Sequence, residues 1–190
     1  MSKDLMYQDE IHQLVADAYR ALDSADAAGA AFYTDDQLAS LPVEARQWAL
    51  GVGNPIAWAD LREGESVVDL GCGAGIDALL AADAVGPAGQ VTGVDVLAEM
   101  VDRAETFAAE ARVGNVAWRH AAMEALPLAD ASVDVVVSNG AINLSPRKSR
   151  VLAEAHRVLR PGGRLCVSDL TIREEELPTE ILTHPSAWAG

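Results

Sequence analysis

The stretch VVDLGCGAGID, residues 67–77, decides the fold of this chain. A run of strand-forming residues leads directly into the spacing Gly71-x-Gly73-x-Gly75, and helix-forming residues follow. Glycines at such a junction let the backbone turn sharply and let a ligand approach the main chain, where the N-terminus of the helix offers unpaired N–H groups. The stretch therefore predicts a strand-loop-helix unit that binds a small ligand.

Short apolar runs and helical segments continue to alternate after this unit. Such an alternation predicts a Rossmann-like, mostly parallel α/β sheet with helices on both faces. The crossover 121–132 is expected to be irregular. Ser145-Pro146 is expected to cap the last helix, and Pro161-Gly162-Gly163 is expected to end that helix before the last strand. The expected strands are 66–70, 90–95, 115–120, 133–138 and 163–169, and the expected helices are about 75–85, 97–112 and 146–160.

The residues before this core have helical signals of their own. Apolar residues at helical spacing predict an amphipathic helix over 5–22. Thr34 and Gln37 form a capping-box pattern, and Asn54-Pro55 is a typical helix start. We therefore divide the chain into a helical N-terminal extension with a cofactor-capping loop, a ligand-binding core and a tail, with the bounds 1–62, 63–170 and 171–190.

Composition limits the classes of partner. A chain of 190 residues, half of them apolar, is long enough for one domain with a helical extension. The net charge of −15 opposes nucleic-acid phosphates and anionic lipid surfaces. No run approaches the length of a membrane span, and the first 25 residues are too charged for a secretory signal. We expect a cytoplasmic protein with a small-molecule substrate, and neither a nucleic-acid nor a membrane partner. Its two cysteines indicate no metal site.

Acidic residues around the glycine loop indicate which ligand it takes. Asp95 follows Gly75 by twenty residues, at the end of the second expected strand, where a carboxylate can accept both ribose hydroxyls of an adenosine. Sites for NAD and FAD favour G-x-G-x-x-G, which leaves room for a pyrophosphate. Here the loop is G-x-G-x-G, and Asp69 before it would repel phosphates but suit the ammonium of a methionine moiety. The loop therefore favours S-adenosyl-L-methionine over a nicotinamide cofactor.

Several of these residues also have a purely structural interpretation. The glycines alone would make a tight turn, Cys72 fits as a small filler, and Cys166 is expected in the core. The histidines give no general base: His12 and His156 lie in charged helices, His120 ends a strand, and nothing demands a role for His184. We therefore assign no catalytic residue. The four tryptophans are expected to pack, with Trp48 near enough to the loop 49–56 to touch an acceptor; they are Trp48, Trp58, Trp118 and Trp188.

Four blocks from about Ala49 to Gly190 resemble class I S-adenosylmethionine-dependent methyltransferases, and more narrowly the arsenite methyltransferase group. LGVGNP, residues 50–55, resembles that group's L-G-C-G-N-P, and GVDVLAEM, residues 93–100, resembles G-V-D-M-T-x-E-M. VVSNGAINLSPRK, residues 136–148, resembles S-N-C-V-I-N-L-S-P-x-K. EAHRVLRPGGRLCVSDL, residues 154–170, is similar to its last helix and fifth strand.

The resemblance implies a role for each position of the cofactor site. The segment from Asp69 to Gly75 would hold the methionine part, with Asp77 and Asn139 beside it, and Asp95 would take the ribose. Where many relatives have an acid for the adenine amino group, this chain has Ala122, so the backbone would supply that contact. The implied cofactor-binding residues are Asp69, Gly71, Cys72, Gly73, Gly75, Asp77, Asp95, Val96, Met100, Met123, Glu124 and Asn139. The residues expected to line the substrate are Tyr19, Trp48, Val52, Asn54, Gly140 and Asn143.

The chain departs from that group at the substrate. Arsenite methyltransferases hold As(III) through cysteine thiolates, because a soft metalloid prefers sulfur ligands. Val52 and Gly140 stand at two of these cysteine positions, and residues 25–31 replace an early cysteine pair. We expect a methyltransferase whose small-molecule acceptor is not arsenite. Two alternatives stay open: a non-catalytic cofactor-binding subunit that needs a partner chain, and an arsenite methyltransferase proper.

The end of the sheet raises a further expectation. Sheets of this class have seven strands, but the 20 residues after Leu170 include Pro178 and Pro185 and do not read as two more strands. We therefore expect the C-terminal strands to be absent and the fifth strand to be an unpaired edge. A homodimer contact, a partner chain or a missing C-terminal segment would cover it.

Overall fold

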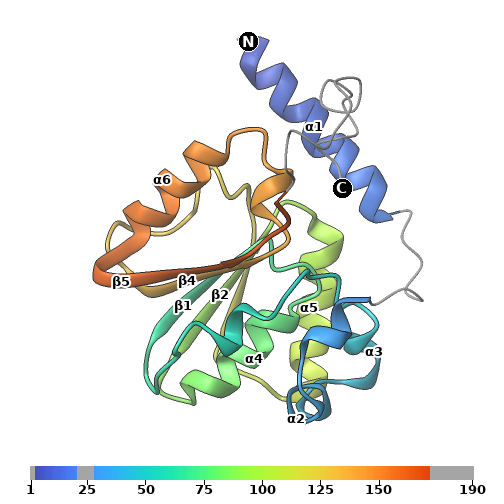
Figure 1. Cartoon of the computed structure of the whole chain (residues 1–190), viewed down its shortest axis with the longest axis vertical. Helices are drawn as coiled ribbons and strands as arrows, with labels where there is room; N and C mark the ends of the chain where they lie inside the picture. The colour runs from blue at the N-terminus through green and yellow to red at the C-terminus, as the bar shows by residue number, and fades with distance from the viewer. Residues whose placement is uncertain (1–2, 21–27, 172–190) are drawn as a thin grey trace.

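The computed structural model describes residues 3–20 and 28–171, which build one parallel sheet with helices around it (Figure 1). The strand order is β3-β2-β1-β4-β5, and every neighbouring pair is parallel. The expected Rossmann-like sheet is therefore confirmed. The order reverses between β1 and β4, and in such sheets ligands bind at that point, outside the carboxyl ends of the strands. The strands are β1 Ser66–Leu70, β2 Gln90–Asp95, β3 Val116–His120, β4 Val133–Asn139 and β5 Leu159–Ser168.

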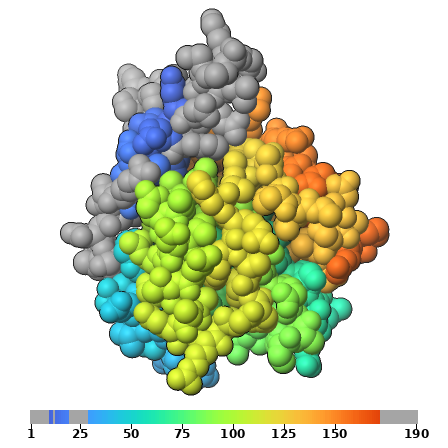
Figure 2. Space-filling model, turned by 180° about the vertical axis from the view of Figure 1, so that it is seen from behind, coloured from blue at the N-terminus to red at the C-terminus, as the bar shows by residue number. Residues whose placement is uncertain are grey.

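Helices cover both faces of the sheet. Alternate residues of a strand point to opposite faces, and both faces present apolar side chains that helices bury. Val67 and Val135 pack against α4, Ile76–Val85, whereas Val68 and Val136 pack against α6, Lys148–Val158. On the α4 side, α5, Ala98–Ala111, joins the same layer. Figure 2 shows the molecule from behind, where α5 and the segments around β3 form the green and yellow surface.

The last helix and strand differ from expectation in their boundaries. α6 begins at Lys148 with no side-chain cap, although the Ser145 hydroxyl accepts the backbone N–H of Arg147 at 3.0 Å. β5 begins immediately after α6, four residues earlier than expected, and contains Pro161. The register against β4 shifts at this point. A bulge on an edge strand tolerates a proline, because the missing N–H would otherwise face solvent.

The first N-terminal helix lies next to the carboxyl ends of the strands, whereas Leu41 and Ala45 of the following segment pack against α4 and α5. α1, Lys3–Arg20, places Ala16 against Leu97 and Met100. The capping box of α2 is confirmed, since Thr34 and Gln37 exchange both hydrogen bonds. Asn54 also caps as expected, but it starts only a 3₁₀ turn. The remaining short elements are η1 Ala28–Phe32, α2 Asp35–Ser40, α3 Val43–Arg46, η2 Pro55–Ala57 and η3 Ile142–Leu144.

β5 forms one edge of the sheet over residues 28–171, and it has β4 on one side only. Leu165 and Val167 are exposed on it. That a second copy or another chain covers this edge stays a prediction. His184, Trp188 and nearly all of the expected tail lie outside the described residues. Of the helices in 3–20 and 28–171, none has the length and apolar character needed to cross a membrane.

Candidate functional site

A cavity opens where the strand order reverses, at the carboxyl ends of β1, β2 and β4. Its empty volume is about 950 Å³, including the space at its mouth, which is at the upper end of the range for small-molecule sites. The glycine loop lines one side, Val15 and Tyr19 of α1 line another, and the segment before η2 contributes Ala49 and Leu50. The cavity therefore lies where the sequence pattern places the cofactor.

Two glycines of the loop have different surroundings, although both have positive φ angles, +70° for Gly71 and +50° for Gly73. A Cβ atom on Gly71 would lie 2.2 Å from the Cβ of Ala141, so this glycine is needed for close packing. By contrast, no described atom lies within 4 Å of a Cβ built on Gly73, which lines the cavity. Gly73 thus leaves open space beside the main chain, where a ligand can approach the backbone.

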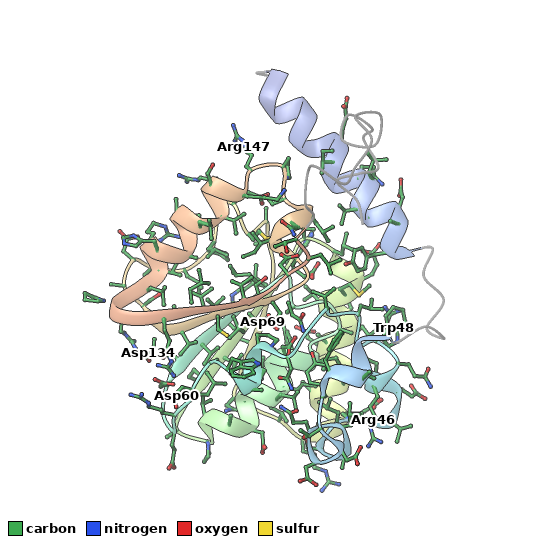
Figure 3. All side chains as sticks on the ribbon, in the orientation of Figure 1. Arg46, Trp48, Asp60, Asp69, Asp134 and Arg147 are labelled. Carbon is green, nitrogen blue, oxygen red and sulfur yellow. The ribbon has the colours of Figure 1, made fainter. Side chains whose placement is uncertain are left out.

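Three buried carboxyl groups meet beside this loop: Asp69 at the end of β1, Asp77 at the start of α4 and Asp95 at the end of β2. They are 1%, 7% and 9% exposed, and Asp69 lies in the interior of the molecule (Figure 3). The Oδ2 atom of Asp69 has no hydrogen-bond partner among the described residues. Burial, together with the charges of Asp77 and Asp95, raises the pKa of Asp69 well above its usual value.

Asp77 and Asp95 have hydrogen-bond donors that partly offset their burial. Burial raises the pKa of Asp77 to about 6, against the opposing hydrogen bonds from Asn139 and Tyr33. Asp95 accepts the backbone N–H groups of Gly73 at 2.8 Å and Leu97 at 2.9 Å, and burial nevertheless raises its pKa. The Asp95 carboxylate is thereby fixed at the rim of the glycine loop, with lone pairs left for a ligand hydroxyl.

The described lining of the cavity contains carboxylates but no lysine, arginine or histidine. Within the same residues, no group of His, Cys, Asp and Glu side chains is placed to hold a metal ion. A buried carboxylate without a cation is costly, so the site fits a ligand that brings positive charge. S-Adenosylmethionine, with a sulfonium and an ammonium, meets this requirement, whereas a pyrophosphate does not.

A hydrogen-bond network that the sequence did not reveal connects the acid cluster to the loop 51–54. The Tyr33 hydroxyl donates to Asp77 at 2.9 Å, and Asn139 Nδ2 donates to Asp77 at 3.0 Å. Asn139 Oδ1 accepts the N–H groups of Val52 and Gly53 at 2.9 and 3.1 Å. No local motif could have found Tyr33, because it lies 44 residues before Asp77 and follows the short 3₁₀ helix η1. Asn139 acts in this structure as a connection between the loop and the cofactor side.

The adenine side of the expected site is lined by Val96, Met100, Met123 and Glu124. The Glu124 carboxylate is buried and accepts the hydroxyl hydrogen of Ser145. Trp48 forms the neighbouring wall and is labelled in Figure 3. The Arg103 guanidinium lies 3.5 Å from the centroid of the Trp48 ring, which is a cation–π distance.

Most of the expected residues line the cavity, but five do not. Asp69 is buried and is not part of the lining, and Gly75 caps α4, where a Cβ would meet Trp118 at 2.6 Å. Among the substrate residues, Val52 lies beside Gly140 and is not part of the lining. Asn54 hydrogen-bonds to Phe32, Gln37 and Ala57, and Asn143 hydrogen-bonds to Asp169 and Leu170. The expected residues that do line it are Tyr19, Trp48, Gly71, Cys72, Gly73, Asp77, Asp95, Val96, Met100, Met123, Glu124, Asn139 and Gly140.

The expectations for structural residues have mixed outcomes. Cys72 is a buried filler as expected, and burial raises the pKa of its thiol well above the usual value. Cys166 is only half-buried. Trp58 does not pack as expected: it is 82% exposed, because it follows the short η2 turn at the surface. His156 is exposed, and His120 lies 3.0 Å from the Val96 carbonyl oxygen through Nε2.

Comparison with known proteins supports the same assignment. The methyltransferase domain family matches residues 61–189. An arsenite methyltransferase of Halobacterium salinarum is 43% identical over 83% of this chain and 40% of its own length. The 27-O-demethylrifamycin SV methyltransferase of Amycolatopsis mediterranei is 38% identical over 59% of this chain and 41% of its own.

A solved structure also matches. The arsenic(III) S-adenosylmethionine methyltransferase of Chlamydomonas reinhardtii superposes with a TM-score of 0.71 and 41% identity, over 80% of this chain and 53% of that one. The chain thus spans about 40% of the length of the two curated relatives. On sequence and fold together, it belongs to the methyltransferase domain family and, within the class I S-adenosylmethionine-dependent methyltransferases, to the arsenite methyltransferase-like group.

Proposed function

We propose that this chain binds S-adenosylmethionine in the cavity at the carboxyl ends of β1, β2 and β4, and that it transfers the methyl group to a small-molecule acceptor. The observation that carries the proposal is the cluster of buried carboxyl groups in a cavity whose described lining has no cationic side chain. The names of the relatives support the reaction class.

In this proposal each part of the site has one task. Asp95 accepts the ribose hydroxyls, Val96 and Met100 hold the adenine between them, and Gly73 leaves the backbone open to the methionine part. Asp69 and Asp77 supply negative charge at the methionine end. The bound cofactor supplies an electrophilic methyl carbon on a sulfonium.

The remaining work of the chain is to orient the acceptor and exclude water. Methyl transfer depends mainly on holding the acceptor atom about 3–3.5 Å from the methyl carbon. The network of Asn139, Tyr33 and Asp77 fixes the loop 51–54 beside the methionine end. Val15 and Tyr19 of α1 line the same cavity and limit the access of water.

We propose further that the acceptor is an organic molecule and not arsenite. As(III) needs several thiolates, and this chain has two cysteines. Burial keeps the Cys72 thiol protonated by raising its pKa. The Cys166 sulfur lies 3.3 Å from the Pro55 carbonyl oxygen and is not part of the cavity lining. Val52 and Gly140, where the arsenite group has cysteines, offer no sulfur ligand.

Arsenite is the second candidate acceptor, because two of the relatives described above carry that name at 43% and 41% identity. The test is transfer of the labelled methyl group from S-adenosylmethionine to As(III) with a thiol reductant, run beside a set of small organic nucleophiles. Transfer to an organic acceptor and none to As(III) is expected. Turnover of As(III) at a comparable rate would contradict the acceptor proposal, and tight cofactor binding without any transfer would favour a non-catalytic cofactor-binding subunit.

A further inference from the structure

The three buried carboxyl groups beside the cavity have no cationic side chain among its described lining residues to balance their negative charge. Asp69, Asp77 and Asp95 come from β1, α4 and β2, and each is at least nine-tenths buried. Asp69 Oδ2 accepts no hydrogen bond from the described residues. A carboxylate in such a position either keeps a proton or receives a cation from outside the protein.

The groups that face the cluster leave both possibilities open. Tyr33, which follows η1, donates to Asp77, and the Tyr19 phenol of α1 lies near Asp95. Cys72 of the loop is buried beside Asp69 and Asp95. Three further groups face the cluster from other elements. His120 of β3 acts on Asp95 through its charge, and Asn139 of β4 contributes a neutral amide. Glu124 lines the same cavity. His120 is the one cationic candidate in this set, and it is exposed on β3 and is not part of the cavity lining.

We propose that the carboxyl cluster of Asp69, Asp77 and Asp95 makes the cavity respond to the charge of the sulfur centre. S-Adenosylmethionine then binds with release of a proton from the cluster, whereas its product S-adenosylhomocysteine binds without that release. The cluster thereby determines the preference for cofactor over product and makes it rise with pH. This inference rests on the proposed function and adds the means by which the same site distinguishes its two adenosyl ligands.

The chemistry of methyl transfer changes only one charge in the ligand. The bond between sulfur and the methyl carbon breaks with both electrons staying on sulfur, while the acceptor donates the pair that forms the new bond. The sulfonium becomes a neutral thioether, so the ligand goes from a net charge of about +1 to about 0, because its ammonium and carboxylate cancel. In a buried site this single charge interacts strongly with nearby carboxylates.

The direction of the pH effect follows from linkage. Burial raises the pKa of Asp77 to about 6 and that of Asp69 well above its usual value. A cationic ligand lowers these values, so it binds best where the carboxyl groups have lost their protons. The preference for the cation is therefore weak where the carboxyl groups are protonated, and it increases as pH rises through about 6, where Asp77 loses its proton.

The experiment is calorimetric titration of the purified chain with three ligands at pH 5.0, 6.0 and 7.0. The ligands are S-adenosylmethionine, S-adenosylhomocysteine and sinefungin, which carries an ammonium in place of the sulfonium. We expect the ratio of Kd for S-adenosylhomocysteine to Kd for S-adenosylmethionine to rise about fivefold from pH 5 to pH 7, with sinefungin following S-adenosylmethionine. Titrations at pH 6 in two buffers of different ionisation enthalpy measure the protons released on binding. Binding of S-adenosylmethionine should release about half a proton more than binding of S-adenosylhomocysteine.

Variants test which groups carry the effect. Asp77→Asn, which removes the group with a pKa of about 6, should reduce the fivefold rise to less than about twofold, and Asp69→Asn should also make the rise smaller. Asp134→Asn is the matched control, because this carboxylate lies at the opposite end of the sheet, where it pairs with Arg160 at 2.6 Å (Figure 3). The Arg160 side chain and the Ser66 backbone hold the pKa of Asp134 below its usual value, so the control should keep the full pH dependence.

The outcomes separate the inference from the function on which it rests. Binding of both adenosyl ligands with a pH-independent ratio would overturn the inference and leave the proposed function in place. The same holds if sinefungin follows S-adenosylhomocysteine. If none of the three ligands binds, the proposed function fails and the inference with it. The wild-type titration decides these cases even if a buried variant does not fold.

Discussion

Replacing Asn139 by alanine tests whether one side chain connects the loop 51–54 to the cofactor side of the cavity. Its Oδ1 atom accepts two backbone N–H groups, from Val52 and Gly53. Its Nδ2 atom lies 2.8 Å from the Gly53 carbonyl oxygen, 3.0 Å from Asp77 and 3.1 Å from the Tyr33 hydroxyl. An amide nitrogen has two hydrogens for these three acceptors, so about four hydrogen bonds exist at one time.

The expected loss of stability follows from this count. A hydrogen bond contributes about 0.5–1.5 kcal/mol net, and some of the freed groups regain water at a half-buried site, so we expect a loss of about 2–4 kcal/mol in the free energy of unfolding. The loop should also lose its position, because a Cβ on Gly51 would lie 2.2 Å from Asn139 Nδ2, which shows how closely the two pack. Binding of S-adenosylmethionine should therefore weaken beyond what stability alone explains.

Urea denaturation and calorimetric titration of S-adenosylmethionine measure the two effects. Asn115→Ala is the matched control, since Asn115 Nδ2 donates to the carbonyl oxygens of Ala82 and Gly86 at the opposite end of the sheet. Both variants should lose stability, but only Asn139→Ala should weaken binding, by about tenfold. A loss below about 1 kcal/mol, or equal cofactor affinity in the two variants, would refute the role of Asn139.

Three further predictions concern single positions. Gly73→Asn should abolish cofactor binding while the chain stays folded, because asparagine tolerates the φ of +50° and its side chain would enter open cavity space; Gly71→Asn should instead disrupt folding, because its Cβ would lie 2.2 Å from the Cβ of Ala141, and circular dichroism beside titration separates the two. Hydrogen bonds from Arg157 lower the pKa of Glu154, so the stability that this carboxylate contributes is present above about pH 5 and lost as pH falls through the lowered value. Urea denaturation of Glu154→Gln should therefore show its largest deficit near neutral pH and little at pH 3, and a constant deficit would refute the ion pair's role. Arg103→Met should free the Trp48 ring, which steady-state fluorescence would record as a changed emission, and it should weaken cofactor binding by about two- to fivefold, whereas Arg103→Lys should restore much of it.

The local signals of the sequence predicted most of the sheet. The strand-loop-helix unit 67–77 was correct because its information is contained in neighbouring residues: apolar strand residues, glycines and a helix start. The irregular crossover 121–132 was also correct, since it contains no helix. The start of β5 was not, because whether Pro161 can lie in a strand depends on that strand being an edge, which is a property of the whole sheet.

The candidate site could be predicted only where its residues belong to motifs. Asp95 lies beside the glycine loop because the ends of parallel neighbouring strands meet, so spacing along the chain was informative. Tyr33 and Asn139 meet across 106 residues, and no periodicity carries such a contact. Val52 and Asn54 belong to a motif, but the sequence could not show that Val52 stays outside the cavity lining or that Asn54 caps only a 3₁₀ turn.

The binding of S-adenosylmethionine in this cavity is tested most directly by calorimetric titration of the chain with S-adenosylmethionine and, in parallel, with NADH. We expect one site for S-adenosylmethionine, no binding of NADH, and an affinity reduced by about 1.5–3 kcal/mol in Asp95→Ala, because that change removes charge-assisted hydrogen bonds to the ribose. Binding of NADH without binding of S-adenosylmethionine would contradict the assignment of the cofactor, and an unchanged affinity in Asp95→Ala would show that the ribose lies elsewhere.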